Sequence, residues 1–258
     1  MISSFRFGWI DYFQKKNILI RITQFLFGIL FLHSRQIAYC LFRMVSFKKN
    51  DKILDLGCGD GCFSNWISYN GGIQVTGIDL LDNRISNARA TSMRYNMSCK
   101  YNNLDIESVV FAPNSFSKIL IIDVLEHIKN PKDILRRCYN WISSRGIIFI
   151  SVPKKKQKRW LKIKNSDFFS YGDDEHKHDG FEEKEILNWL NEIGFTIIKS
   201  KEIFYSIYQI IWELLEPIRI KYPNLYRFLV PFVYPLIILD RVIPIGPGNG
   251  LIVVAQKL

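Results

Sequence analysis

The sequence predicts an α/β fold organised around one mostly parallel sheet, and two observations carry this prediction. From about residue 51, short β-branched apolar runs alternate with segments of helical periodicity, which is the βαβ rhythm of a parallel sheet. In addition, 258 residues of which 48% are hydrophobic can bury one sizeable core, and this length suits one domain with additions better than two. We therefore predict a main domain over residues 51–258, preceded by a helical extension over residues 1–50.

The predicted strands and helices alternate along the chain. Strands are expected at 52–57, 73–79, 98–104, 117–123, 146–152, 195–203 and 250–258, the third being the weakest. Helices are expected at 62–70, 81–95, 131–143 and 182–194. Pro131 stands where a first helical turn tolerates proline, and Gly194 follows the last of these helices as a C-cap glycine does. A seven-stranded sheet with helices on both faces results.

An apolar, aromatic insert at residues 204–247 precedes the last strand. We expect its prolines to break any continuous helix; they are Pro217, Pro223, Pro231 and Pro235. The longest charge-free stretch, residues 228–239, has twelve residues and is too short to cross a bilayer. We expect an interfacial or re-entrant membrane contact here, and the alternative is an apolar lid packed on the protein's own core.

The charge of the chain is strongly positive and unevenly distributed. Thirty-five Lys and Arg against 24 Asp and Glu give a net charge of +11, which favours an anionic partner such as nucleic acid, phospholipid or a phosphorylated substrate. A predicted basic loop at 153–175 contains seven basic residues and no acid between residues 154 and 164. Lysines beside an apolar surface are what an anionic bilayer attracts, and a solvated loop is the alternative.

Cysteine usage and the N-terminal residues bear on location. The five cysteines form no CxxC pair and no regular framework, which predicts a reducing compartment. The apolar residues 17–32 are interrupted by Arg21 and lack a small-residue cleavage site, so we expect no cleaved signal peptide. Together with the membrane contact, this predicts a cytoplasmic protein that is peripheral at the inner face of the membrane.

A glycine-rich turn follows the first strand in "ILDLGCGDGCFS", residues 53–64. The strand ends in Asp55, and glycines at 57, 59 and 61 precede a helix. Glycines let the backbone turn tightly and approach a ligand at the carboxyl edge of the sheet, where α/β folds bind small molecules. We predict a ligand-binding loop.

Spacing limits which ligand this loop can hold. A dinucleotide fingerprint needs Gly or Ala at the sixth position from Gly57, where Cys62 stands, and no Lys follows for a phosphate-binding loop. Asp79 ends the next strand about 20 residues on and can bind both hydroxyls of a ribose, while Asp105 follows the third strand. Three carboxylates suit a cation better than a pyrophosphate, and a sulfonium nucleoside with an ammonium group is such a cation.

At these residues the chain resembles the class I S-adenosylmethionine-dependent methyltransferases, of the small-molecule type that includes the quinone-biosynthetic O-methyltransferases. The resemblance covers roughly residues 51–203 and the final strand, and it implies a Rossmann-like sheet whose last strand is antiparallel. It also implies S-adenosylmethionine as the cofactor. The residues that match its cofactor-binding segments are Asp55, Gly57, Cys58, Gly59, Gly61, Asp79, Leu80, Asp105, Ile106 and Asp123.

Histidines after the fourth and fifth predicted strands are candidates for the base that a hydroxyl acceptor requires. Methyl transfer is an in-line displacement, so the protein positions the acceptor and removes its proton. His127 follows the fourth strand, and His176 and His178 follow the fifth, on the ligand-binding edge. We favour His127 or His178, and a loop histidine bonded to backbone or solvent is the alternative for each. A divalent metal is the other alternative, with hard oxygen ligands and an imidazole available from Asp123, Glu126, His127 and Asp179. We predict no metal site, because HxH alone is not a zinc motif.

The favoured function is methyl transfer to an oxygen of a hydrophobic or lipid-linked small molecule, such as a quinone precursor, an isoprenoid lipid or a lipid-carried glycan. An RNA methyltransferase that uses the basic segment 154–164 is one alternative. Nucleic acid is disfavoured because Trp160 is nearly alone among the aromatics of the basic segment and no nucleic-acid module is apparent. A non-catalytic membrane-associated protein that retains the fold is the other alternative.

Overall fold

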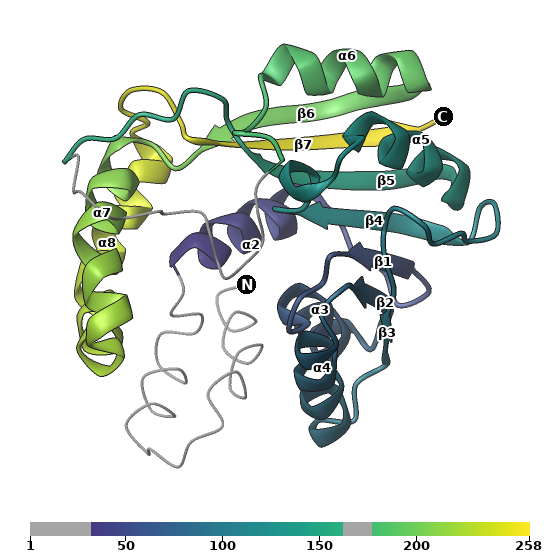
Figure 1. Cartoon of the computed structure of the whole chain (residues 1–258), viewed down its shortest axis with the longest axis horizontal. Coiled ribbons are helices and arrows are strands. Elements are labelled where there is room, and N and C mark those ends of the chain that lie inside the picture. The colour runs from purple at the N-terminus through teal and green to yellow at the C-terminus, as the bar shows by residue number, and fades with distance from the viewer. Residues whose placement is uncertain (1–31, 162–176) are drawn as a thin grey trace.

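The computed structural model describes residues 32–161 and 177–258. Its centre is a seven-stranded sheet with the order β3-β2-β1-β4-β5-β7-β6 (Figure 1). The strands are β1 (Lys52–Leu56), β2 (Gln74–Asp79), β3 (Cys99–Asn103), β4 (Phe116–Ile122), β5 (Ile142–Pro153), β6 (Phe195–Ile203) and β7 (Gly250–Lys257). All seven predicted strands are confirmed, including the weak third one.

The direction of the strands places the candidate residues at one edge. Strands β1 to β5 pair in parallel, whereas β7 runs antiparallel to both β5 and β6. The antiparallel last strand and the Rossmann-like arrangement are therefore confirmed. Parallel strands end at the same edge of the sheet, so the residues after β1, β2, β3 and β4 are neighbours.

Helices cover both faces of the sheet (Figure 1). They are α2 (Leu32–Met44), α3 (Cys62–Gly71), α4 (Asp82–Arg94), α5 (Pro131–Trp141), α6 (Glu183–Ile193), α7 (Ser206–Lys221) and α8 (Pro223–Val242), with a short 3-10 turn η2 at Leu125–His127. The caps follow the sequence signals, because Pro131 opens α5 and Gly194, with φ of 110°, closes α6 in the left-handed conformation.

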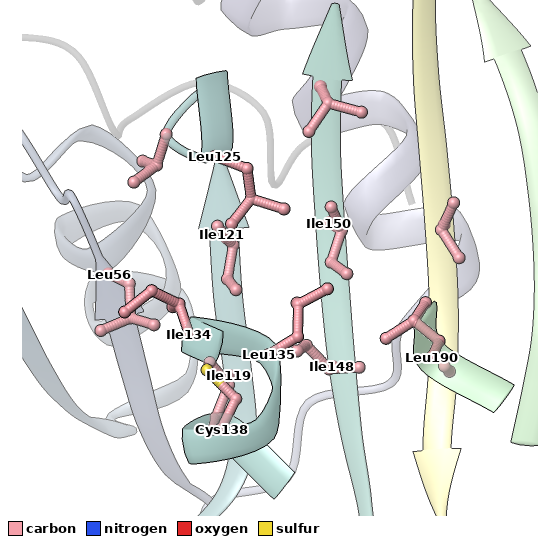
Figure 2. Close-up of a cluster of buried hydrophobic side chains, with 14 of the residues drawn as sticks. Leu56, Ile119, Ile121, Leu125, Ile134, Leu135, Cys138, Ile148, Ile150 and Leu190 are labelled. Atoms are coloured by element: carbon pink, nitrogen blue, oxygen red, sulfur yellow. The ribbon is translucent and has the colours of Figure 1, made fainter. Parts of the chain in front are cut away.

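Alternating strand residues divide the core between the two faces, since successive side chains of a strand point in opposite directions. Leu54, Ile119 and Ile148 belong to the buried cluster that packs under α5 and α6, and Figure 2 shows Leu135 and Cys138 of α5 and Leu190 of α6 lying over this layer. Ile53, Leu120 and Phe149 belong to the opposite cluster, which α2, α3, α7 and α8 cover.

Helix α2 is part of this second cluster and not a separate layer. Leu32, Ile37, Cys40 and Leu41 are buried there beside strand and α7 residues. The prediction of helix before residue 51 is thus confirmed for residues 32–44, and the predicted helices nearer the N-terminus lie outside the described residues. The domain boundary at residue 51 stays a prediction.

The prediction that prolines would break the insert was wrong for three of the four. Pro217 lies within α7 and Pro231 and Pro235 lie within α8; only Pro223 stands at a break, as the first residue of α8. An interior proline removes one backbone hydrogen bond and costs about 3 kcal/mol. Here the burial of one side of each helix, including Trp212, Tyr226 and Ile237, opposes that cost.

The two helices form an antiparallel hairpin beyond the carboxyl ends of β4 and β5 (Figure 1). Among residues 32–161 and 177–258, no helix combines the length and the apolar character needed to span a bilayer.

Candidate active site

The glycine loop joins β1 to α3 in a backbone conformation that only glycine adopts easily. Gly57, Gly59 and Gly61 have φ of 67°, 52° and 75°, in the left-handed region. A Cβ on Gly57 would stand 2.4 Å from Cγ2 of Val124, whereas one on Gly59 would meet nothing nearer than 3.8 Å. The loop is therefore packed closely against the residue after Asp123 and is open at Gly59.

Asp55 lies beneath this loop and is almost completely buried. Its Oδ2 accepts a hydrogen bond from the Ser64 hydroxyl at 2.6 Å. Burial raises the pKa of Asp55 to about 7; the Ser64 bond opposes this rise and the nearby Asp79 carboxylate adds to it. Asp55 thus holds a proton more tightly than an ordinary aspartate does. Cys58, which follows Gly57, is also buried, and burial raises the pKa of its thiol.

Asp79 ties the end of β2 to the glycine loop. Its Oδ2 accepts the backbone N–H of Gly59 at 2.9 Å, and its Oδ1 accepts the N–H of Leu81 at 2.9 Å. Each carboxylate oxygen keeps a second lone pair, so the group can still accept hydrogen bonds from a ligand. The side chain of Leu80 beside it is 65% exposed, which leaves an apolar surface next to this carboxylate.

The segment after β3 lies against the same edge. The Asn103 amide donates to the carbonyl oxygens of Asp79 and Leu80 at 3.1 and 2.7 Å. Asp105 is exposed, and its Oδ1 accepts the N–H of Glu107 at 2.8 Å; Ile106 is buried. The structure therefore brings Asp55, Asp79 and Asp105 to one edge of the sheet. Asp55 and Asp79 are buried there and Asp105 is exposed.

His127 and His178 come from adjoining segments. The carbonyl oxygen of Glu126 accepts the backbone N–H groups of Lys177 and His178 at 2.9 and 3.0 Å. The His178 ring also lies 3.0 Å, at Nε2, from the carbonyl oxygen of Ile128. His178 therefore anchors its loop to the turn after β4, which matches the alternative of a histidine bonded to backbone. His127 is half-buried on that turn, and its role as base stays a prediction; His176 lies outside the described residues.

The structure adds a histidine that sequence reasoning missed. Nε2 of His33, in the first turn of α2, lies 2.8 Å from Oδ2 of Asp123 at the end of β4. The other oxygen of Asp123 accepts the Ser151 hydroxyl at 3.0 Å. The His33 ring stacks on Phe204, with 4.5 Å between centroids. No local motif marks His33, because the pairing depends on α2 packing across the carboxyl ends of β4 and β5.

The described residues near this edge include several acids that could be considered as metal ligands. Within residues 32–161 and 177–258, no group of three His, Cys, Asp or Glu side chains is arranged to hold a metal ion. Burial, together with the charge of Asp123, raises the pKa of Glu126 well above its usual range.

Comparison with known proteins gives the family. A family model described as "Methyltransferase domain" matches residues 30–200. The chain belongs to this family. The matched residues include α2, the glycine loop and the ends of β2 and β4, so the methyltransferase carries its candidate site within the matched region. The expectation of a class I S-adenosylmethionine-dependent methyltransferase is confirmed.

Curated relatives and solved structures extend the comparison. The methyltransferase is 33% identical over 111 residues to a protein of Idiomarina loihiensis named ubiquinone biosynthesis O-methyltransferase, covering 43% of this chain and 45% of that one. A protein of the same name from Colwellia psychrerythraea is 26% identical, with 60% and 65% covered. The chain thus spans about half the length of the first curated relatives it matches. A Haemonchus contortus phosphoethanolamine N-methyltransferase 2, solved with S-adenosyl-L-methionine, superposes with a TM-score of 0.64 at 20% identity, over 98% of this chain and 60% of that one, which shows a shared fold.

The residues of this edge fit S-adenosylmethionine, the cofactor of the family. In this arrangement Asp79 would offer its remaining lone pairs to ribose hydroxyls and Leu80 its exposed side chain to the adenine ring, while the open approach at Gly59 would leave room for the methionine portion. The partly buried carboxylates favour a cationic ligand. When bound, this cofactor supplies a methyl group activated by a sulfonium. The residues of the chain that would hold this ligand lie at the glycine loop and at the ends of β2 and β3.

Proposed function

We propose that this methyltransferase transfers a methyl group to an oxygen of a hydrophobic or lipid-linked phenol of the quinone-precursor type, at a membrane surface. The observation that carries the proposal is a row of exposed apolar side chains on the hairpin beside the candidate site. The names of the curated relatives support an oxygen acceptor of this type. Isoprenoid lipids and lipid-carried glycans are further acceptors that the same surface would admit.

The row of exposed side chains, called the apolar stripe below, follows one face of α8. Its members are between 41% and 67% exposed and are spaced by three or four residues, as on one side of a helix; they are Leu225, Phe228, Phe232, Leu236 and Leu239. Exposed apolar surfaces of this extent mark interaction sites. A row of Phe and Leu on a helix that cannot span a bilayer is typical of interfacial binding.

The basic segment lies against the same hairpin. The buried carboxylate of Glu213 in α7 accepts the backbone N–H groups of Trp160 and Leu161 at 3.0 and 2.6 Å. Lys155 and Lys156 are exposed nearby. Each Lys or Arg close to an anionic bilayer contributes on the order of 1 kcal/mol to binding. The net charge of +11 and the apolar stripe therefore favour the same partner, an anionic membrane, while the basic residues from 162 to 164 lie outside the described residues.

We also propose that the protein acts from the cytoplasm, at the inner face of the membrane. All five cysteines are free thiols in the structure, which agrees with a reducing compartment. RNA is the competing acceptor, and the basic segment is the feature that supports it. Lys154 in that segment pairs with Glu202, which reduces equally the charge that the segment offers to RNA and to lipid phosphates.

A reconstituted assay tests the proposal. The protein is incubated with S-adenosylmethionine and a polyprenyl-substituted catechol in anionic vesicles, and separately with total RNA. The proposal predicts a mono-O-methyl ether of the catechol and no methylated RNA. Methylated RNA with an unchanged catechol would favour the competing function.

A further inference from the structure

His33 and Asp123 form a hydrogen-bonded pair at the carboxyl end of β4. A carboxylate only accepts hydrogen bonds, so the 2.8 Å contact with Asp123 Oδ2 places the ring proton on Nε2. The lone pair of the neutral imidazole then resides on Nδ1, which makes no hydrogen bond to the described residues. A histidine oriented by an aspartate, with its second nitrogen free, has the arrangement of a general base.

Asp123 is held in place by Ser151 of β5. The Ser151 hydroxyl donates a hydrogen bond to Oδ1 of Asp123, and the Ser151 carbonyl oxygen accepts the backbone N–H of Asp123 at 2.9 Å. Asp123 is the carboxylate in contact with His33, at 2.8 Å, and a negative charge there stabilises an imidazolium.

The backbone is strained on both sides of the His33 ring. Asp123 has φ of 54° and Phe204, which stacks on His33, has φ of 63°. A bulky residue such as Phe rarely adopts this conformation, and strained residues of this kind cluster at functional sites. Trp212 stands 5.8 Å from the His33 ring, centroid to centroid. His33 thus has an aromatic surrounding in which a phenol ring can stack.

The pair lies next to the glycine loop and remains accessible. Val124, the residue after Asp123, fills the space where Gly57 lacks a side chain. The side chains of His33 and Asp123 are 25% and 32% exposed, so a ligand can reach them. This is the place where an acceptor must lie if the cofactor occupies the edge defined by Gly59 and Asp79.

We propose that His33 is the general base of the methyl transfer and that Asp123 is its positioning residue, an inference that rests on the proposed function. Nδ1 of His33 takes the proton of the acceptor hydroxyl, and the electron pair left on that oxygen forms the new bond to the methyl carbon. The bond from that carbon to the sulfonium of S-adenosylmethionine would break at the same time, its electron pair staying on the sulfur of the departing S-adenosylhomocysteine. Asp123 keeps the proton of Nε2 in place and stabilises the resulting imidazolium. His127 and His178 then have no part in proton transfer.

The test compares two acceptors that differ in acidity, catechol and nitrocatechol, using the full-length protein. Nitrocatechol is already ionised at moderately alkaline pH and needs no base. His33→Ala is expected to lower kcat for catechol by about 10²- to 10³-fold and to change kcat for nitrocatechol by less than about 5-fold. Added imidazole is expected to restore part of the catechol rate. His33→Gln, which keeps a polar side chain of similar size, is expected to behave like His33→Ala.

A measurement without turnover accompanies the rates. In the complex with S-adenosylhomocysteine, wild-type protein is expected to bind nitrocatechol in its ionised form at a pH just below the pKa of the free compound, seen as the absorbance band of the anion. His33→Ala is expected to bind the neutral form. Asp123→Asn is expected to lower kcat for catechol with little change in KM. Ser34→Ala, at the next position of α2, is the control and should leave rates and spectra unchanged.

The outcomes separate this inference from the proposed function. The assignment of His33 as base is wrong if His33→Ala keeps the wild-type kcat with catechol. It is also wrong if the variant lowers kcat by the same factor for both acceptors while its affinity for S-adenosylhomocysteine falls. If wild-type protein binds S-adenosylhomocysteine and methylates neither compound, the proposed function fails for phenols, and the assignment of His33 fails with it.

Discussion

The carboxylate of Asp79 accepts the backbone N–H of Gly59 at 2.9 Å, and this bond joins the ends of two neighbouring strands into one ligand-binding edge. We expect Asp79→Ala to remove both this bond and the acceptors for the ribose. Hydrogen bonds to a charged group contribute about 1.5–3 kcal/mol each, so the affinity for S-adenosylhomocysteine should fall about 100-fold in a calorimetric titration. Asp133→Ala, which removes an exposed aspartate on α5, should bind like the wild type. Equal affinities in the two variants would contradict the assignment.

The glycine loop allows a prediction with an internal control. Gly57 and Gly72 have similar φ values of 67° and 60°, but an added Cβ clashes with Val124 at Gly57 and meets nothing within 4 Å at Gly72. Gly72→Ala should lower the free energy of unfolding by about 1 kcal/mol through backbone strain alone. Gly57→Ala should lower it by about 3 kcal/mol, because overpacking adds to the strain. Urea unfolding measures both, and equal losses would show that Val124 moves aside without cost.

The raised pKa of Asp55 should make the free energy of unfolding depend on pH. This pKa rises from 3.8 to about 7 in the folded protein, so between these values the folded state binds a proton that the unfolded state has lost, and the stability from this group falls as pH rises. Asp55→Asn removes that dependence. From pH 5 to pH 8, wild type should lose about 3 kcal/mol relative to Asp55→Asn. Parallel stability curves for the two proteins would show that Asp55 titrates normally.

The apolar stripe predicts binding to vesicles. Phe228 and Phe232 are 57% and 67% exposed, and burial of a Phe side chain contributes about 1.5–3 kcal/mol. The double change Phe228→Ser and Phe232→Ser should therefore weaken binding to anionic vesicles at least about 10-fold in a sedimentation assay. Val110→Ser, at an 80% exposed apolar position away from the hairpin, is the matched control. Unchanged binding in the double variant would exclude the stripe as the membrane contact.

Glu213 holds the basic segment against α7. Glu213→Ala should release the backbone N–H groups of Trp160 and Leu161 and make Lys155 to Arg159 more sensitive to trypsin, with the affinity for S-adenosylhomocysteine unchanged. Glu216→Ala is the control, because this buried carboxylate of the same helix pairs with Arg219. Equal proteolysis of both variants would indicate a general loosening of α7.

The fold could be predicted from local patterns, whereas the acceptor side could not. Strand runs and the glycine loop are local signals, and Gly57, Gly59 and Asp79 lie where those signals place them. His33 and Asp123 are 90 residues apart, and only the packing of α2 brings them together. The same tertiary packing explains why α8 continues through Pro231 and Pro235, since local propensity yields to the burial of one helix face.

The fate of the transferred methyl group decides whether the acceptor is a lipid-linked phenol. Wild-type protein is incubated with methyl-labelled S-adenosylmethionine and a whole-cell extract that contains membranes, and the label is then measured in the lipid, RNA and protein fractions. Label is expected in the lipid fraction, on a phenolic oxygen identified by mass spectrometry, and it should be lost in Asp79→Ala. Label confined to RNA or protein, or no transfer at all, would contradict the proposed function.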